Sequence, residues 1–243
     1  MATLTNIGLL VAEAVFYFVV MTALFRARRR FGIGLFFCAL GTMHFLETYL
    51  AAILYIALPG DMAISPGSVI LFSGKLAMLL LVYIREDAAT VRQPIYGLLI
   101  GNFLMVGLVL LLRHHIALPT VSARSPDFAF MDEMGWLMVW GTTLLFFDCL
   151  FVVLLYERSA AWFGNRPTAR FLLCMTTVLT FDQVGFFAAL YFFLGFPLKA
   201  FLGGWLAKMA AAVFYSVAIG LYLRYGEAAV GLVAPVAAYL AEF

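Results

Sequence analysis

Seven long apolar stretches constrain the fold of this chain more than any other feature. About 20 apolar residues cross the hydrocarbon core of a bilayer as a helix, and only helices or closed barrels satisfy their backbone hydrogen bonds in lipid. The chain is 65% apolar and 12% charged, against ~45–50% and ~25% in an ordinary soluble domain. The sequence therefore predicts an all-α polytopic membrane protein with seven transmembrane helices at 6–25, 33–57, 64–84, 95–112, 135–156, 171–196 and 201–223.

The segments between these stretches have the composition of turns and loops. Residues 58–61 read as a turn, and 85–94 as a short polar loop in which Pro94 opens the next helix, as proline at a first helical position often does. The longest loop is predicted at 113–134 and a basic loop at 157–170, and Gly195 with Pro197 ends the sixth span.

The arginines and lysines between the spans predict the orientation. With the N-terminus outside, the inner side holds ten basic residues and the outer side three; the inner ones are Arg26, Arg28, Arg29, Arg30, Arg85, Arg92, Arg158, Arg166, Arg170 and Arg224, and the outer ones Arg113, Arg124 and Lys199. The positive-inside rule then predicts N-out and C-in, as a multi-pass protein of the cell (inner) membrane. Since arginines follow the first apolar run rather than precede it, we expect no cleaved signal peptide.

The C-terminal end differs from the rest of the chain. We expect a transmembrane domain over 1–225 and a short apolar cytoplasmic tail or linker over 226–243. Residues 228–243 are too few to span the bilayer and contain Pro235. An interfacial helix and a linker to a cytoplasmic signalling domain or partner are both open interpretations.

Seven ionisable residues lie inside the apolar stretches: Glu13, His44, Glu47, Lys75, Asp148, Asp182 and Lys208. A charge at membrane depth costs roughly 2.5 kcal/mol or more on the mildest scale, so such groups pair, line a cavity or bind a ligand. From their positions in the spans, we expect these residues to lie between the centre of the bilayer and its outer face. We therefore predict a polar intramembrane pocket lined by these seven residues, which binds a small molecule.

Two details bear on how that pocket is built. His44 and Glu47 are three residues apart and share a helix face, which suits either a pH-sensitive pair or a hydrogen bond that joins two helices. If Lys75 and Lys208 each pair with one acid, two acids remain that are neutral, share a proton or meet a ligand. Buried ion pairs can also be purely structural, and Asn102 and Gln183 can act as interhelical hydrogen-bonding groups.

The fifth and sixth spans contain the same short pattern. Residues 142–148 and 176–182 both read T-T-x-L-x-F-D, on helices of opposite predicted direction. Inverted repeats often place a binding site at the bilayer midplane. Chance similarity between two phenylalanine-rich helices is the alternative.

Other chemistries find little support in the sequence. Cys38, Cys149 and Cys174 all lie in apolar spans without CxxC spacing, so we expect no disulfide framework and no metal site. The net charge of +2 is small, which argues against nucleic-acid binding. We expect no cofactor and no enzymatic activity.

Residues 44–102 carry a resemblance to a known family. They include HFLETYLAAILY and SPGSVILFSGKLAMLLLVYIREDAATVRQPIYGLLIGN. This stretch resembles vitamin-uptake-like membrane sensor domains, which are related to queuosine-precursor and vitamin uptake transporters; Arg92 with Tyr96-Gly97, and a mid-membrane aspartate after phenylalanine at 147–148 and 181–182, add to the likeness. The resemblance implies that Glu47, Lys75, Asp148 and Asp182 face the ligand. Sensors of this kind usually precede a cytoplasmic signalling domain, and no kinase, PAS or cyclase segment follows Leu223 in this sequence.

Several functions remain as hypotheses. The first is a small-molecule binding or sensing module that passes a helix shift to the tail. The second is a proton-coupled transporter of a small polar solute (vitamin or nucleobase-like), in which Asp148 or Asp182 carries the proton. A retinal protein is disfavoured because Gly204 stands where that family has an acid, four residues before Lys208. An intramembrane aspartyl protease lacks its motifs here, and haem binding has only His44 to offer.

Overall fold

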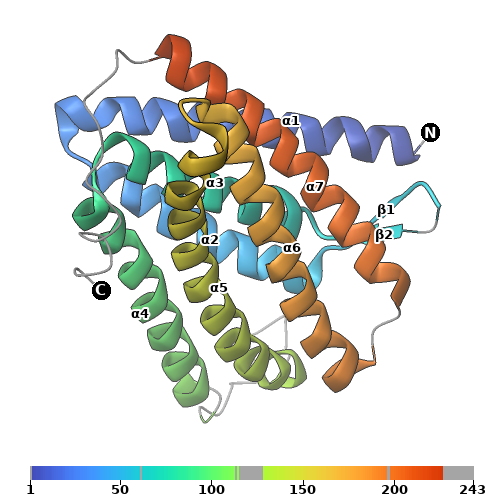
Figure 1. Cartoon of the computed structure of the whole chain (residues 1–243). Coiled ribbons are helices and arrows are strands. Elements are labelled where there is room, and N and C mark those ends of the chain that lie inside the picture. The colour runs from blue at the N-terminus through green and yellow to red at the C-terminus, as the bar shows by residue number, and fades with distance from the viewer. Residues whose placement is uncertain (1, 61, 113, 115–127, 196–197, 227–243) are drawn as a thin grey trace.

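The computed structural model describes residues 2–60, 62–112, 114, 128–195 and 198–226. Within these residues the chain forms a helical bundle with one small hairpin and two π-helical segments (Figure 1). The elements are α1 Ala2–Phe31, α2 Gly34–Ile53, β1 Ile56–Leu58, β2 Met62–Ile64, η1 Gly67–Leu71, α3 Phe72–Arg85, α4 Ala88–Leu112, α5 Phe128–Phe163, α6 Pro167–Leu194, α7 Leu198–Leu221 and η2 Tyr222–Gly226.

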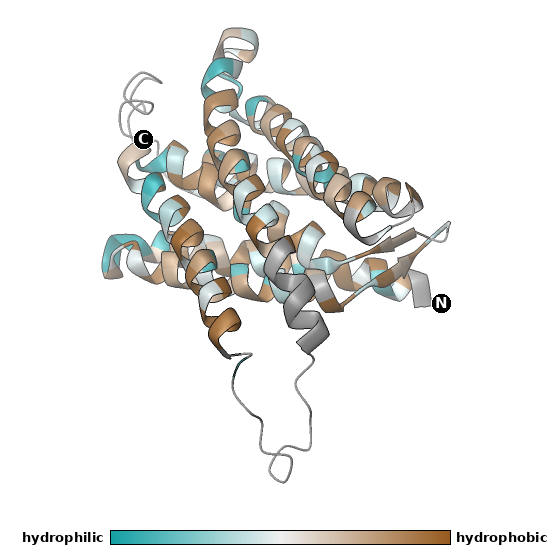
Figure 2. Cartoon of the chain, turned by 90° about the horizontal axis from the view of Figure 1, so that it is seen from below, coloured by the Kyte–Doolittle hydropathy of each residue, from teal (hydrophilic) through white to brown (hydrophobic). Residues whose placement is uncertain are grey.

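Six helices in the described part of the chain are long and apolar enough to cross a membrane: Leu4–Phe31, Gly67–Arg85, Ala88–Leu111, Leu137–Phe163, Pro167–Phe192 and Phe201–Gly226. The predicted all-α polytopic architecture agrees with this finding. α2 is not among the six, and its apolar residues are interrupted by Thr42, His44, Glu47 and Thr48. Hydrophobic residues cover most helical turns, and hydrophilic residues gather toward the helix ends (Figure 2).

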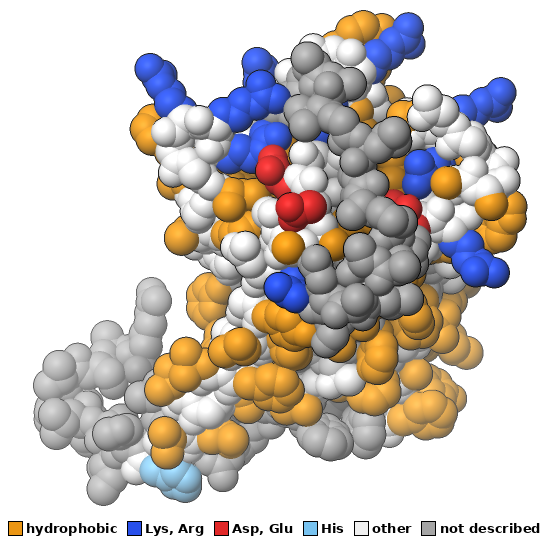
Figure 3. Space-filling view, turned by 60° about the vertical axis from the view of Figure 1, so that its left-hand side comes forward, with side chains coloured by type: hydrophobic (Ala, Val, Ile, Leu, Met, Phe, Trp, Pro, Cys, Tyr) orange, Lys and Arg blue, Asp and Glu red, His pale blue; other side chains and the backbone are white. Residues whose placement is uncertain are grey.

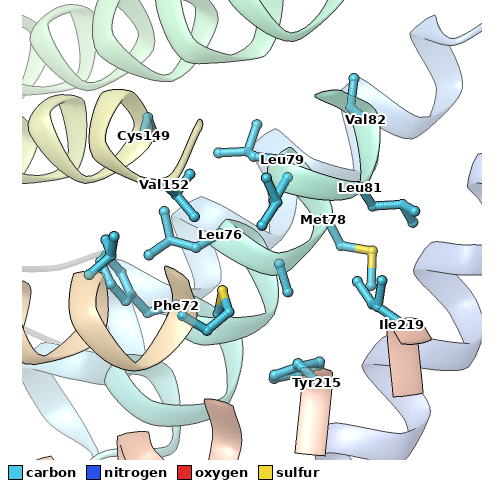
Figure 4. Close-up of a cluster of buried hydrophobic side chains, with 14 of the residues drawn as sticks. Phe72, Leu76, Met78, Leu79, Leu81, Val82, Cys149, Val152, Tyr215 and Ile219 are labelled. Atoms are coloured by element: carbon cyan, nitrogen blue, oxygen red, sulfur yellow. The ribbon is translucent and has the colours of Figure 1, made fainter. Parts of the chain in front are cut away.

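α3 forms the centre of the bundle. In the apolar stretch Gly67–Arg85, which comprises η1 and α3, 78% of the most apolar part is buried, against 22–44% in the other five membrane-length helices. A helix that is apolar all round is one that is enclosed by its neighbours. Leu76 and Leu79 lie toward Val152 of α5, and Met78 lies beside Ile219 of α7 (Figure 4). A side chain on α3 can therefore meet groups from most of the bundle.

The ends of the bundle differ in charge. The α1–α2, α3–α4 and α5–α6 connections and η2 lie toward the upper left of Figure 1, and the N-terminus and the hairpin lie on the right. Every arginine in the described residues belongs to the first of these ends. Figure 3 shows Lys and Arg mainly on the upper half of one face, where some Asp and Glu also lie, and hydrophobic side chains prevailing among the coloured ones below. Arg113, Arg124 and residues 227–243 lie outside the described residues, and the side chain of Lys199 is not described.

Several connections differ from the sequence prediction. A turn at Pro59 and Gly60 lies within a hairpin in which Ile56 pairs with Ile64, and the second helix ends at Ile53 rather than at residue 57. The amide of Asn6 donates to the Ala57 carbonyl at 3.0 Å and joins this hairpin to α1. Gly60 has φ +78, a left-handed conformation that suits glycine.

The prediction that Pro94 opens a helix is wrong. α4 begins at Ala88 and contains Pro94. The Asp87 carboxylate accepts a hydrogen bond from the Thr90 amide at 2.6 Å, so Asp87 caps the helix, which starts six residues before Pro94. The predicted basic loop is also shorter than 157–170, since α5 continues to Phe163 and α6 starts at Pro167. Part of the predicted loop 113–134 likewise belongs to α5, which begins at Phe128.

The end of the sixth helix agrees with its prediction. α6 ends at Leu194, and Gly195 follows it with φ +66. This left-handed residue is the usual glycine signal for a helix C-terminus.

Candidate functional site

Four polar side chains from three helices form one buried cluster, which we call the α2–α3–α4 cluster: His44, Glu47, Lys75 and Asn102. The Lys75 ammonium donates to both oxygens of Glu47, at 2.8 and 2.7 Å, and to His44 Nδ1 at 2.9 Å. His44 Nε2 lies 3.0 Å from Asn102 Oδ1. All four side chains are buried, and Lys75 is 1% exposed.

The hydrogen bonds around His44 assign its role in this cluster. An ammonium group can only donate, so a ring that accepts from Lys75 at Nδ1 carries its proton on Nε2 and donates to Asn102 Oδ1. Nδ1 also lies 3.3 Å from Glu47 Oε2. His44 of α2 thus contacts α3 through Nδ1 and α4 through Nε2.

Close backbone approach places Glu47 against the centre of the bundle. A Cβ atom at Gly67 would lie 2.5 Å from the Glu47 carbonyl oxygen and 2.8 Å from the Ala51 nitrogen. η1 therefore packs on α2 at a distance that only glycine permits. Ser65 Oγ donates to the Leu50 carbonyl at 2.9 Å on the same side of α2.

Three ionisable side chains from three other helices form the α5–α6–α7 cluster: Asp148, Asp182 and Lys208. Lys208 Nζ donates to Asp182 Oδ2 at 2.5 Å. Asp148 is 0% exposed, and as a carboxylate it has no hydrogen-bond partner at either oxygen in the described residues. A proton on either acid allows a side-chain hydrogen bond between Asp148 and Asp182. The charged groups that act on it are Asp182, Lys208 and Lys75.

Neutral polar groups support this cluster from α6 and α7. Gln183 donates to the Phe201 carbonyl at 3.2 Å, and Trp205 Nε1 donates to Thr180 Oγ1 at 3.0 Å. These bonds fix α6 and α7 near Asp182 and Lys208. Gln183 was expected from the sequence as an interhelical group, and it has that role here.

Phe72 connects the two clusters. Its ring centroid lies 4.7 Å from Lys75 Nζ and 5.2 Å from Lys208 Nζ, within the range of cation–π attraction. The first turn of α3 thus stands between both lysines. Six of the seven ionisable residues singled out in the sequence lie around this helix. That they contact a ligand stays a prediction.

Glu13 does not join them. It is exposed on the outside of the bundle in α1, and the prediction that it lines the pocket is not supported by its position. Tyr17 is one of the α1 residues that turn inward, at 3% exposure. Its ring packs edge-on against Tyr215 of α7 at 6.2 Å between centroids.

Sequence reasoning missed Tyr17, Phe72 and Tyr215. Tyr215 donates to the Ile70 carbonyl at 3.1 Å and so joins α7 to η1. A helical spacing signal existed for Tyr215, which follows Lys208 by seven residues and so lies on the same helix face. The spacing of Tyr17 from Glu13 gave no such signal, because Glu13 is exposed and Tyr17 is buried.

The exposed position of Glu13 gives a test. Because it lies outside both clusters, Glu13→Leu is expected to change the unfolding free energy by no more than about 0.5 kcal/mol. Reversible denaturation in mixed micelles measures this. A loss as large as that of Glu47→Gln would instead place Glu13 in the polar interior of the bilayer-embedded protein.

The cysteines and acids show no cluster suited to a metal. No group of three or more His, Cys, Asp or Glu side chains in the described residues is placed to hold an ion. Cys149 and Cys174 are buried and Cys38 is exposed, and all three are free thiols.

Comparison with known proteins identifies the family. The family model described as "Vitamin uptake-like sensor" matches residues 18–223, a range that includes both clusters and begins after Glu13. No curated protein and no solved structure matched the chain in the same comparisons. The chain, a helical membrane protein with its ionisable side chains gathered around a central helix, belongs to the vitamin uptake-like sensor family.

Proposed function

We propose that this chain is a membrane-embedded sensing module that binds a small polar molecule at the α5–α6–α7 cluster. The observation that carries the proposal is Asp148, whose carboxylate is fully buried and has no hydrogen-bond partner in the described residues. Leaving a buried charged group unsatisfied costs about 1–3 kcal/mol or more. Unpaired buried polar groups are uncommon and often mark functional sites.

The position of Asp148 supports the same proposal. Asp148 of α5 has charged neighbours on three other helices: Asp182 on α6, Lys208 on α7 and Lys75 on α3. A ligand that satisfied Asp148 would contact several helices at once. Binding could then favour one helix arrangement over another, which is what a sensor requires.

α3 offers a route from this site to the arginine-rich end of the bundle. Arg85 follows Lys75 by ten residues, about 15 Å along the helix axis. Its Nη2 donates to the Leu223 carbonyl at 3.0 Å, and Leu223 lies in η2. π-helical turns are often found at functional sites, so a shift of α3 would move the segment that leads to the C-terminal tail.

This route predicts the effect of an Arg85 variant. Arg85→Met is expected to broaden the distance distribution between spin labels at Arg224→Cys and Asn165→Cys, because η2 loses its link to α3. Double electron–electron resonance spectroscopy in nanodiscs measures the distance distribution. Arg158→Met, an exposed arginine of α5, is the matched control, and equal broadening in both variants would contradict the route.

Native mass spectrometry tests the sensing proposal directly. The protein purified in detergent from its membranes is expected to carry a small molecule, and Asp148→Asn is expected to lose it. Fractionated small-molecule extracts should also raise the melting temperature of the wild type. The proposal fails if neither a co-purified molecule nor a stabilising fraction is found.

We also propose the predicted topology in the inner membrane. α2 crosses the membrane in addition to the six long apolar helices, which gives seven crossings, with the N-terminus outside and the C-terminus inside. Two observations support this topology: successive helices run in opposite directions through the bundle, and the described arginines lie at one end of it. In a background without native cysteines, Pro59→Cys should react with an impermeant maleimide from outside, and Asn165→Cys only after lysis. The reverse pattern would overturn the orientation.

A proton-coupled transporter is the second candidate. Asp148 and Asp182 end the two matching strings on α5 and α6, and they are electrostatic neighbours in the structure. That juxtaposition is what an inverted repeat with a midplane site would produce. Uptake of a labelled solute into proteoliposomes, abolished by Asp148→Asn or Asp182→Asn, would favour transport over sensing.

A further inference from the structure

The two buried clusters differ in how fully their hydrogen-bonding capacity is used. From this difference we infer that the α2–α3–α4 cluster is a fixed scaffold and that the α5–α6–α7 cluster binds a small organic cation with N–H donors, such as a primary ammonium. The inference rests on the proposed function in that a ligand reaches this cluster. It adds the chemical class of the ligand.

The α2–α3–α4 cluster is saturated. The Lys75 ammonium has three protons, and they match three acceptors: both oxygens of Glu47 and His44 Nδ1. The second ring nitrogen of His44 meets Asn102. One ammonium balances one carboxylate, so this cluster has neither the charge nor the free valence to recruit a ligand.

The α5–α6–α7 cluster is short of one positive charge. It holds two carboxylates, Asp148 and Asp182, and one ammonium, Lys208. Lys208 bonds to Asp182 Oδ2, and while both acids are ionised neither oxygen of Asp148 has a donor in the described residues; only a proton shared with Asp182 would supply one from the protein. Because Lys75 is already committed to Glu47, the missing charge must come from a proton or from a ligand.

The surroundings favour a cation with N–H groups. An anion would meet two carboxylates at short range, which is repulsive in a low-dielectric interior, while the two neighbouring ammonium groups, Lys75 and Lys208, are already paired with Glu47 and Asp182. A donor-bearing cation would offer Asp148 charge-assisted hydrogen bonds, which are the strongest kind. The Phe72 ring, already within cation–π range of both lysines, adds an aromatic surface of the sort that attracts organic cations.

Thermal melting in nanodiscs with methylammonium chloride as the probe tests the inference. At constant ionic strength the wild type should show a saturable rise in melting temperature. Tetramethylammonium, which has no N–H donor, and methanol, which has no charge, should give no rise. Absence of any methylammonium effect on the wild type would overturn the inference.

Variants locate the effect. Asp148→Asn should weaken the methylammonium response about tenfold or more, the loss expected for one charge-assisted hydrogen bond. The unliganded Asp148→Asn protein should melt at or above the wild-type temperature, because a buried unpaired carboxylate has been removed. Glu13→Gln is the matched control. Glu13 is also an acid within an apolar helix, but it lies outside both clusters, so this variant should keep the full response.

Asp182→Asn provides a second variant. It frees Lys208 to pair with Asp148, which fills the open valence, so the fold should persist while the methylammonium response is lost. A full response in either aspartate variant would overturn the inference. A neutral co-purified molecule that binds wild type and Asp148→Asn equally would also overturn it, yet would leave the proposed sensing function standing.

Discussion

Glu47→Gln is expected to lower the unfolding free energy by about 3–5 kcal/mol, the usual result of leaving one partner of a buried ion pair uncompensated. Lys75 is 1% exposed and donates to both Glu47 oxygens. Removal of the Glu47 charge leaves an ammonium at the centre of the bundle. Reversible denaturation in mixed micelles, followed by circular dichroism, measures the loss.

A double-mutant cycle isolates the pair. Lys75→Met alone should cost a similar amount, because it leaves the Glu47 carboxylate buried. The double variant Glu47→Gln/Lys75→Met should cost much less than the sum of the singles, since replacing both partners removes the unpaired charge. Strict additivity of the two losses would show that Glu47 and Lys75 do not depend on each other.

Gly67→Ala is expected to lower the unfolding free energy by about 1–3 kcal/mol, the cost of forcing extra volume into a packed interior. The new Cβ would lie 2.5 Å from the Glu47 carbonyl oxygen and 2.8 Å from the Ala51 nitrogen. Both are backbone atoms of α2, which cannot turn aside as a side chain can. The substitution should therefore separate η1 from α2 and displace Glu47 from Lys75.

Gly101→Ala is the matched control for this substitution. A Cβ at Gly101, also in a helix, meets nothing within 4 Å. Alanine is the better helix former by up to about 1 kcal/mol, so this variant should be neutral or stabilised in the same denaturation experiment. Equal losses at both positions would mean that the close contact with α2 does not decide the outcome.

Much of the bundle was predictable because helices in lipid must satisfy their own backbone hydrogen bonds. The long apolar runs marked the helices, and Gly195 marked the end of α6. The errors fall at local boundaries: Asp87 capped α4 before Pro94, and the residues after Ile53 paired as strands. A cap or a short hairpin depends on a few local contacts, which apolar run length does not report.

The ionisable residues were recognisable as a set because each is costly at membrane depth. Their partners were not recognisable, since Lys75 and Glu47 are 28 residues apart and Lys208 and Asp182 are 26 apart. Nothing in the sequence showed that Asp148 would be the acid without a partner. Glu13 carries the same charge in a similar span, yet it lies on the outside of the bundle.

The order of amino acids by itself determined that this chain is a helical membrane protein with a polar interior. Only the tertiary structure decided that α3 is the enclosed helix while α1, of nearly equal hydropathy, is mostly exposed. The physical reason is that lipid tails and a protein interior are about equally apolar, so hydropathy cannot distinguish a helix face that meets lipid from one that meets protein. Close helix packing, such as the contact of Gly67 with α2, determines which helix faces are enclosed by protein. The same packing determines which acids lie next to which lysines.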